Sequence, residues 1–313
     1  MEQAFAVETS TRADVIYDDW ARDHLKGGFV LKISIVTPSF NQCNFIEECL
    51  RSVKAQKCSA VEHIVADGLS TDGSLEILQR YSEQSSYDHL RWVSEPDQGQ
   101  SDALNKGFRM ATGDIVGWLN SDDRYRPKCF KAVIEAFDKN PDVDVLYGDY
   151  TWIDERGRVL QVRREIEFSQ FVLSYHRVLY IHSTATFFRR RIFDEGNFID
   201  LQYHYSMDYE FFLRLAQKGY RFKHAPGLLA DFRWHPNSKT AAHPEKQLAE
   251  HDAIATSYSK VLHNLRNDTS RKLTLSALRF AAAGLRYSEK LVRGYYLGQI
   301  PVFARKMAGV SAR

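Results

Sequence analysis

Two adjacent carboxylates, Asp122 and Asp123, directly follow an apolar run that is typical of a buried strand. Residues 115–119 read Ile-Val-Gly-Trp-Leu, which fits a strand covered on both faces. Ligands of open α/β sheets lie at the carboxyl ends of strands, and acids there are costly unless they face water, a cation or a ligand. Because successive side chains of an extended chain point to opposite sides, we expect the two acids to have different roles. A solvated Asp-Asp turn is the alternative.

Acidic residues also follow two earlier expected strands. Apolar periodicity predicts strands at 31–37, 61–66, 90–94 and 115–119, separated by helices at 44–56, 72–81 and 98–111. This alternation is typical of βαβ units, so we predict an α/β fold with a mostly parallel sheet. Asp67 and Asp97 follow the second and third strands, and parallel strands share a direction, so these acids should gather with the adjacent pair at one edge. For each acid taken singly, a turn or helix cap is the alternative.

The next part of the chain is less regular. Its patterns predict a helix at 127–140, a strand at 143–147, a hairpin from 150–154 and 159–163, a strand at 181–188, a helix at 209–218, and two short strands around a turn at 226–227. Asp208 stands at the start of a helix, where an N-cap is the alternative to a chemical role. His235 lies in a polar loop that could hold a ligand, and a structural histidine is the alternative.

Composition and charge exclude several classes of protein. The 313 residues carry a net charge of +2, which names no partner and does not indicate nucleic-acid binding. The four cysteines form no CxxC pair, so we expect reduced thiols in a reducing compartment and no zinc site. Residues 1–28 contain acids and lack the apolar core of a secretory signal. No apolar run is long enough to span a bilayer, so we predict a cytoplasmic protein.

The C-terminal region is helical in pattern and basic. Helices are expected at 244–263 and 270–297, and from residue 264 onward ten Lys or Arg residues face two acids, a net charge of about +8. On the longer helix the basic residues share one sector and the apolar residues the opposite half. The basic sector contains Lys272, Arg279, Arg286, Lys290 and Arg293. Two interpretations stay open. In the first, the helix at 270–297 lies on an anionic membrane surface, at the inner face of the membrane. In the second, the apolar face of the helix packs on the main domain and its basic face is solvated.

Five short motifs occur in order along residues 32–240, and as a set they resemble those of the family 2 glycosyltransferases, which have the GT-A fold. The motifs are Thr37-Pro38-Ser39-Phe40-Asn41, Ala66-Asp67-Gly68 with Ser70-Thr71-Asp72-Gly73, Glu95-Pro96-Asp97-Gln98-Gly99, Ala103-Leu104-Asn105-Lys106-Gly107 and Leu119-Asn120-Ser121-Asp122-Asp123. The resemblance implies an N-terminal extension at 1–31, a GT-A domain at 32–240 and a helical, basic extension at 241–313. Within the domain it implies a nucleotide-binding half at 32–126 and an acceptor half at 127–240.

The resemblance also implies residue roles. Thr37, Pro38 and Asp67 would form the nucleotide-base pocket, Asp97 would lie at the nucleotide edge, and Asp122 would face the ribose. Asp123, with His235, would hold Mg²⁺ or Mn²⁺ on the diphosphate, because hard cations take oxygen ligands and need few protein carboxylates when phosphates complete the shell. Asp208 would be the general base. Two positions depart from the family pattern, Met207 where glutamate is common and Leu69 where glycine is common.

The implied activity is inverting, metal-dependent transfer of a sugar, of the hexosyl or N-acetylhexosaminyl type. The donor would be a nucleotide-diphosphate sugar, a UDP-sugar in the first instance, and the acceptor the hydroxyl of a saccharide or lipid-linked saccharide in cell-surface polysaccharide or glycolipid assembly. The chain has no Gln-x-x-Arg-Trp segment, so we expect a non-processive enzyme. One alternative is a nucleotidyltransferase, although residues 38–42 lack the glycines and basic residue of a phosphate loop. The other is a non-catalytic nucleotide-sugar-binding module.

Overall fold

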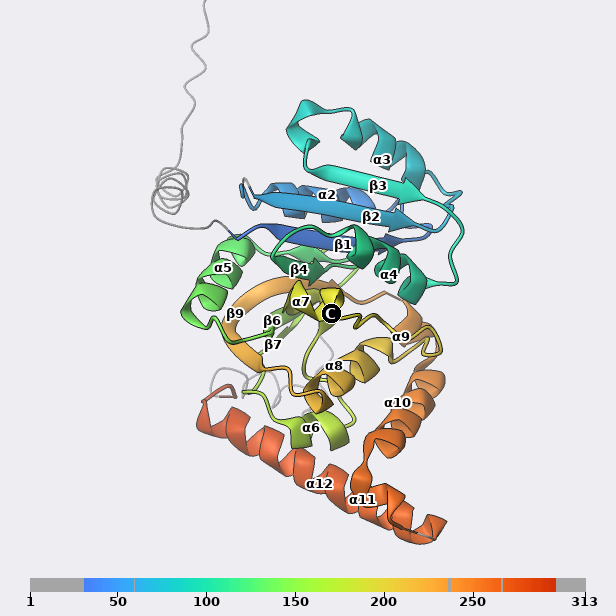
Figure 1. Cartoon of the computed structure of the whole chain (residues 1–313), viewed down its shortest axis with the longest axis vertical. Helices are drawn as coiled ribbons and strands as arrows, with labels where there is room; N and C mark the ends of the chain where they lie inside the picture. The colour runs from blue at the N-terminus through green and yellow to red at the C-terminus, as the bar shows by residue number, and fades with distance from the viewer. Residues whose placement is uncertain (1–30, 59, 236–237, 266, 297–313) are drawn as a thin grey trace, which may run out of the picture.

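The computed structural model describes residues 31–58, 60–235, 238–265 and 267–296, and helices lie on both faces of one curled sheet (Figure 1). The predicted N-terminal extension, 1–31, falls outside the described residues apart from Leu31. The end of the predicted last helix, beyond residue 296, also falls outside them.

The predicted parallel strands of the first part are confirmed. They are β1 (Ile33–Ser39), β2 (Val61–Asp67), β3 (Leu90–Ser94) and β4 (Ile115–Trp118), in the order β3-β2-β1-β4. The helices between them are α2 (Ile46–Lys54), α3 (Ser74–Ser82) and α4 (Gln100–Met110), with a 3₁₀ turn η1 (Ser85–Tyr87) before β3. β1 is buried along its whole length because its alternate side chains face two layers. Ile33 and Ile35 pack with α2, and Val36 packs with α4.

The sheet continues from β4 in the order β4-β8-β6-β9-β5, with β7 paired to β6. These strands are β5 (Arg124–Tyr125), β6 (Val145–Ile153), β7 (Val159–Arg163), β8 (Thr186–Arg189) and β9 (Phe222–Arg233). The helices are α5 (Cys129–Lys139), α6 (Gln170–Tyr175), α7 (Arg191–Asp194) and α8 (Met207–Gln217), and the 3₁₀ turn η2 (Ser183–Ala185) precedes β8. β8 is antiparallel to both β4 and β6, so β6 points the same way as β4. The predicted α/β fold class, a mostly parallel sheet flanked by helices, is confirmed.

One predicted turn is wrong. Residues 222–233 form a single strand, β9, where two short strands were expected. The register of β9 against β6 shifts where Pro226 and Gly227 have no partner, so these two residues form a bulge and do not reverse the chain. Gly227 has a φ of 148°, which glycine adopts without steric cost. β9 therefore reaches the far edge of the sheet, where Arg233 and His235 lie beside the loop that follows β4.

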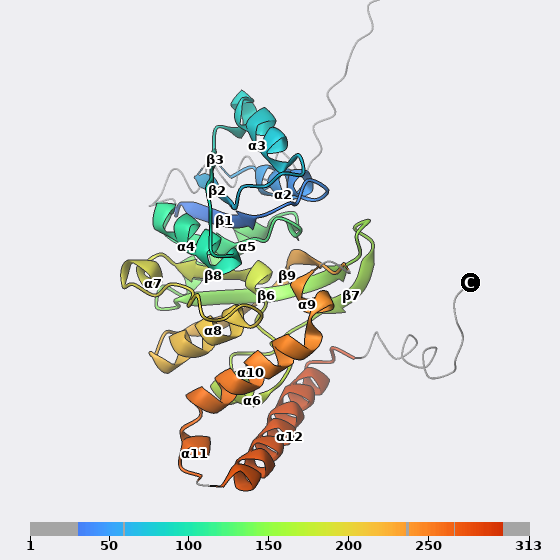
Figure 2. The same ribbon diagram turned by 90° about the vertical axis from the view of Figure 1, so that its right-hand side faces the viewer.

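The C-terminal residues form α9 (Lys239–Ala242), α10 (Pro244–Tyr258), α11 (Lys260–His263) and α12 (Asp268–Val292). The helix expected at 244–263 is broken at Ser259, whose hydroxyl caps α11 by accepting from the backbone N–H of Leu262. α10 packs on α8, where the rings of His251 and Tyr209 stack 3.9 Å apart. Figure 2 shows α10, α6 and α12 together on the same side of the sheet. Among the described residues, no helix is both long and apolar enough to cross a bilayer.

The orientation of α12 contradicts the interpretation with a packed apolar face and a solvated basic face, whereas the membrane interpretation stays a prediction. Most of its basic sector faces the protein, although Lys272 is exposed. Arg286 and Lys290 are buried and lie 2.7 and 2.9 Å from the carboxylate of Glu165, which is itself fully buried. Arg279 and Arg293 pair with acids as well, Asp252 and Glu167 respectively. The apolar half of α12 is exposed instead. A buried carboxylate is costly without cations, so the domain uses the basic sector of the helix to neutralise Glu165.

We expect Glu165→Ala to lower the free energy of unfolding by about 3–5 kcal/mol, because Arg286 and Lys290 would then be buried without their counter-charge. Chemical denaturation followed by circular dichroism measures this change. Glu167→Ala is the matched control, because the side chain of Glu167 is 48% exposed and its pair with Arg293 should contribute less than about 1 kcal/mol. Equal effects of the two substitutions would contradict the role given to the buried cluster.

Candidate active site

The loop after β4 carries the adjacent acids, and α4 holds its first residue. The side-chain oxygen of Asn120 accepts hydrogen bonds from the indole N–H of Trp118 at 2.8 Å and from the amide of Gln100 at 2.9 Å. Gln100 is the first residue of α4. The loop is therefore fixed at the carboxyl end of β4, beside the start of a helix. As expected from the sequence, the two acids that follow have different surroundings.

Asp123 points into the protein and is 1% exposed. One carboxylate oxygen accepts from the hydroxyl of Thr184 and, at 3.2 Å, from the amide of Asn120. The other oxygen accepts from the backbone N–H of Arg233 at 2.8 Å. Burial raises the pKa of Asp123 well above its ordinary value, and the neighbouring charge of Asp122 raises it further.

Asp122 points the other way and meets His235. Its carboxylate lies 3.1 Å from Nε2 of His235, and 18% of its side chain is exposed. The ring of His235 packs 5.2 Å from the ring of Phe45 at the start of α2. Asp122, and not Asp123, therefore has carboxylate surface available beside the imidazole. Protein donors bind both oxygens of Asp123, each of which keeps a second lone pair, and the assignment of Asp123 as the metal ligand stays a prediction.

Arg233 joins the loop to three other segments. It is 1% exposed, and its guanidinium donates to the backbone carbonyl of Asp122 at 2.8 Å. The same group donates to the carbonyls of Asp154 and Glu155, both at 3.0 Å, and pairs with the carboxylate of Glu48 on α2. A buried guanidinium needs several acceptors to offset its lost hydration. Sequence analysis missed this residue, although a lone arginine among the apolar residues of a strand was a visible signal.

The predicted nucleotide-side residues lie at the carboxyl ends of β1 and β2, mostly buried. Thr37 and Pro38 are buried within β1, and the Thr37 hydroxyl lies 2.9 Å from Nε2 of His63. Burial lowers the pKa of His63 to about 3, so its ring is neutral near pH 7. Asp67 is 3% exposed, and its carboxylate accepts from the backbone and hydroxyl of Ser70 and from the hydroxyl of Ser94. Asp67 therefore closes a turn.

Asp97 lies against the turn that Asp67 closes. One oxygen of Asp97 accepts from the backbone N–H of Gly99 at 2.8 Å, and the other would lie 2.4 Å from a Cβ placed on Gly68. Gly68 therefore leaves room for the carboxylate of Asp97 in its present position. Phe40 follows β1 and is 60% exposed. It lies at this same edge, since the backbone N–H of Gly68 donates to the carbonyl of Ser39, the preceding residue, at 2.9 Å. Sequence analysis quoted Phe40 in a motif but gave it no role.

Asp208 is the second residue of α8 and is partly buried. Burial is the main cause that raises the pKa of Asp208 to about 6, and the charge of Glu250 adds to it. Glu250, on α10, accepts from the backbone N–H groups of residues 204, 205 and 206, so it caps the segment that leads into α8. Burial lowers the pKa of Lys239, while the nearby negative charges of Glu250, Asp97 and Asp208 each act to raise it.

The first turn of α4 connects these groups. Gln100 binds the loop that carries Asp122, and the hydroxyl of Ser101 donates to the sulfur of Met207, the residue before Asp208. Asp97 lies three residues before Gln100. The first turn of α4 is therefore bonded to residues near Asp122 and next to Asp208, and Asp97 precedes it in sequence, whereas Thr37, Asp67 and Asp123 are buried. Within the described residues, no group of three His, Cys, Asp or Glu side chains forms a metal site by itself.

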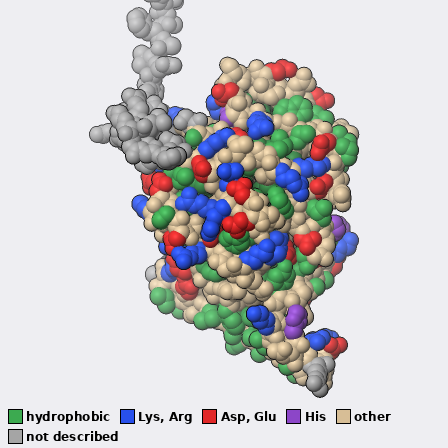
Figure 3. All heavy atoms as spheres, viewed as in Figure 1, with side chains coloured by type: hydrophobic (Ala, Val, Ile, Leu, Met, Phe, Trp, Pro, Cys, Tyr) green, Lys and Arg blue, Asp and Glu red, His purple; other side chains and the backbone are tan. Residues whose placement is uncertain are grey.

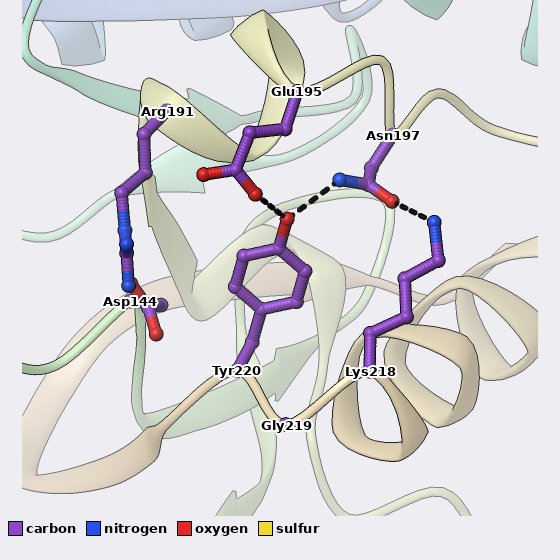
Figure 4. Close-up of a pocket in the computed structure, with 7 residues that line it drawn as sticks. All are labelled: Asp144, Arg191, Glu195, Asn197, Lys218, Gly219 and Tyr220. Carbon is purple, nitrogen blue, oxygen red and sulfur yellow. Dashed lines mark hydrogen bonds and ion pairs between the residues drawn. The ribbon is translucent and has the colours of Figure 1, made fainter.

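A pocket of about 470 Å³ lies elsewhere, before the amino ends of β6 and β9 (Figure 4). It is lined by Asp144, Arg191, Glu195, Asn197, Lys218, Gly219 and Tyr220. Its polar groups bind one another: Lys218 donates to Asn197 at 2.6 Å, and Asn197 donates to the hydroxyl of Tyr220 at 2.8 Å. Because β6 and β4 point the same way, this pocket is at the opposite end of the strands from Asp122.

The fold is that of the GT-A glycosyltransferases. It is similar to Staphylococcus aureus TarS 1-349 in complex with UDP-GlcNAc, with a TM-score of 0.61 and 17% identity over 87% of this chain and 78% of that chain. It is also similar to the mannosyltransferase PcManGT from Pyrobaculum calidifontis in complex with GDP-Man and Mn²⁺, with a TM-score of 0.58 and 18% identity over 95% and 84% of the two chains.

Sequence comparison gives the family. Residues 34–196 match the family model "Glycosyl transferase family 2", and the chain belongs to that family. An uncharacterized glycosyltransferase of Mycobacterium tuberculosis is 32% identical over 186 residues, which cover 59% of this chain and 68% of the relative. One from Nostoc is 32% identical over 117 residues, but the match covers only 36% of that protein. Chondroitin synthase of Escherichia coli is 25% identical over 199 residues, 27% of its length.

We expect Asp123→Asn to lower the free energy of unfolding by about 1–3 kcal/mol, because its new NH₂ group would face donors from Thr184, Asn120 and Arg233. Urea denaturation measures the loss. Asp122→Asn is the matched control at the adjacent position, and we expect a change below about 1 kcal/mol because its carboxylate is partly solvated. A larger loss for Asp122→Asn would show that the buried and accessible acids have been interchanged.

Proposed function

We propose that the protein is an inverting, metal-dependent glycosyltransferase that moves a sugar from a nucleotide-diphosphate donor to an acceptor hydroxyl. The observation that carries the proposal is that the first turn of α4 bonds both the loop that carries Asp122, through Asn120, and the residue before Asp208, Met207. Membership of glycosyl transferase family 2 supports the reaction class. Neighbours bound to UDP-GlcNAc and to GDP-Man support a nucleotide-sugar donor.

Asp122 and His235 are the residues that we propose for the divalent cation. One carboxylate beside one imidazole, with diphosphate oxygens and water in the remaining positions, fits Mn²⁺ or Mg²⁺. When bound, the ion would stabilise negative charge on the departing diphosphate. Asp123 is proposed instead as the residue that positions Asp122, through its bond to the backbone of Arg233. The Mn²⁺ in the structure of the mannosyltransferase neighbour supports metal use in this fold.

The nucleotide would lie at the ends of β1 and β2. Phe40 offers an exposed aromatic face for the base, Asp97 lies at the adjacent turn, and Asp67 holds that turn in shape. A pyrimidine or purine base stacks on an aromatic ring without needing a particular hydrogen-bond pattern. We favour a UDP-sugar donor, of the hexosyl or N-acetylhexosaminyl type, with a saccharide or lipid-linked saccharide as acceptor. Resemblance to chondroitin synthase supports a polysaccharide acceptor.

Asp208 would act as the general base in a single displacement. Its carboxylate accepts the proton of the acceptor hydroxyl while that oxygen bonds to the anomeric carbon of the donor. The bond from this carbon to the diphosphate oxygen breaks, and the configuration inverts. A pKa of about 6 suits the task, because Asp208 is then mostly ionised at pH 7 and still basic enough to accept a proton. A glycosidase would need two carboxyl groups set across the bond.

The two alternatives predict different properties. A nucleotidyltransferase needs backbone and basic groups around a triphosphate, whereas β1 ends at buried Ser39 and is followed by exposed Phe40. A non-catalytic module would bind nucleotide sugar but show no transfer or donor hydrolysis. The anionic membrane surface predicted for 270–297 is not part of the proposal, because the basic residues Arg279, Arg286, Lys290 and Arg293 have acidic partners within the protein.

Nucleotide-sugar binding can be tested by thermal shift with UDP-GlcNAc and GDP-Man, each with and without Mn²⁺. A ligand that binds only the native state, at about 100 times its Kd, stabilises it by about 2.7 kcal/mol and raises the melting temperature by a few degrees. We expect Asp122→Asn to lose the Mn²⁺-dependent part of the shift and Asp123→Asn to keep it. The opposite result would return the metal to Asp123, and no shift with any nucleotide sugar would remove the proposed function.

Asp208→Asn should lower the transfer rate about 10²–10⁴-fold and leave the thermal shift by nucleotide sugar unchanged, because the residue acts on the acceptor proton. In the native enzyme, kcat/KM should fall as the pH drops below about 6, since protonation removes the base. Glu250→Gln removes a negative charge that raises the pKa of Asp208, so the acid limb should move to lower pH. Full transfer activity in a folded Asp208→Asn variant would disprove the assignment.

A further inference from the structure

The outward face of α12 is apolar and carries no charge. Phe280 is 83% exposed, Leu273 68% and Leu291 67%, and all three lie on this face. Between Leu273 and Val292 the structure describes every residue, and none of the exposed ones is charged. Figure 3 shows hydrophobic side chains gathered along the lower edge of the molecule, over α12. A contiguous apolar face of this kind on a protein surface indicates an interaction site.

Six of the exposed residues follow a heptad pattern, and Ser276, Ala281, Leu285, Ser288 and Val292 are exposed beside them. Alternating steps of four and three residues separate Leu273, Ala277, Phe280, Gly284, Tyr287 and Leu291. This spacing places all six side chains along one seam, about 27 Å long at 1.5 Å per residue. Ala282 lies on the opposite side of the helix and is fully buried, so the packing of α12 on the domain holds the seam outward. The seam is therefore a pre-formed helix surface for a second helix.

The sizes of the six residues complement one another when the seam meets a copy of itself in the antiparallel direction. With the two-fold axis at residue 282, Phe280 meets Gly284 of the other copy and Tyr287 meets Ala277. Leu273 meets Leu291, and each contact occurs twice. Every aromatic ring thus enters a space left by a small residue. In a parallel pair identical positions would meet, so rings would oppose rings and Gly284 would oppose Gly284, which packs poorly.

We propose that the protein forms a two-fold symmetric dimer through antiparallel pairing of its α12 helices. A self-complementary patch is the requirement for an interface in which both subunits use the same surface. The absence of charge on the seam of α12 removes any repulsion between copies. A membrane surface is the weaker occupant, because interfacial helices flank their apolar face with several free Lys or Arg residues. Here Arg279, Arg286 and Arg293 pair with Asp252, Glu165 and Glu167, which leaves Lys272 as the exposed residue of the basic sector.

The proposed interface is separate from the active site. Figures 1 and 2 both place α12 at the far end of the molecule from β1, β2 and β3. The dimer therefore does not depend on the proposed function, and loss of the dimer should leave nucleotide-sugar binding intact.

The first experiment measures the mass of the full chain in solution by light scattering after size-exclusion chromatography. The native protein is expected to be a dimer and Phe280→Glu a monomer with an unchanged circular dichroism spectrum. Leu160→Glu, at a 53% exposed leucine on β7, is the matched control and should remain dimeric. A monomeric native protein would overturn the proposal, and so would a dimeric Phe280→Glu variant. Binding of the native monomer to anionic vesicles, lost in Phe280→Glu, would assign the face to lipid instead.

The second experiment tests the direction of pairing by disulfide formation. The double variant Ala277→Cys with Tyr287→Cys should give a covalent dimer under mild oxidation, because the two positions face each other across the antiparallel interface. Each single variant should stay uncrosslinked at the level of the native protein, whose own four cysteines set the background. Two cysteines ten residues apart on one helix are too distant to join within a chain. Cross-linking by either single variant would show parallel pairing and contradict the antiparallel arrangement.

Discussion

The buried carboxylate of Asp123 is the interaction on which the arrangement of the active site depends. It joins the loop after β4 to η2 through Thr184 and to β9 through the backbone of Arg233. A buried polar group is stable only when its partners are all present, so Asp123 constrains the three segments together. The position of Asp122 follows from this constraint: with its neighbour turned inward, its own side chain faces His235.

Buried arginines also join segments that are far apart in the chain, because their donors must be satisfied inside the protein. Arg233 satisfies backbone carbonyls of the 154–155 turn and of Asp122, and Arg286 with Lys290 satisfies Glu165. Such clusters contribute little net stability compared with apolar packing, but they tolerate few alternative arrangements. They therefore specify how the irregular second half of the sheet and the last helix dock onto the regular first half.

The sequence predicted the βαβ half well because local periodicity and burial agree there. β3 has the predicted bounds, and the acids after the strands lie at one edge. Prediction from the sequence was wrong or incomplete where contacts between residues far apart in the chain determine the local structure. Pro226 and Gly227 have the composition of a turn, yet pairing of β9 with β6 makes them a bulge. The different surroundings of Asp122 and Asp123 were predicted, but which acid would be buried depends on Thr184 and Arg233, far along the chain. The inverted docking of α12 depends on one acid, Glu165, more than 120 residues earlier.

The C-terminal helix α10 supports the active site, although the resemblance to the family placed it in a separate extension that begins at residue 241. The carboxylate of Glu250 on α10 accepts three backbone N–H groups just before α8. Those groups would otherwise be unsatisfied at a helix start, so α10 completes the structure that presents Asp208. The same negative charge raises the pKa of Asp208, which makes the aspartate a better proton acceptor. Burial is the main cause of the raised pKa of Asp208, and Glu250, outside the predicted catalytic domain, adds to it and also holds the segment before α8.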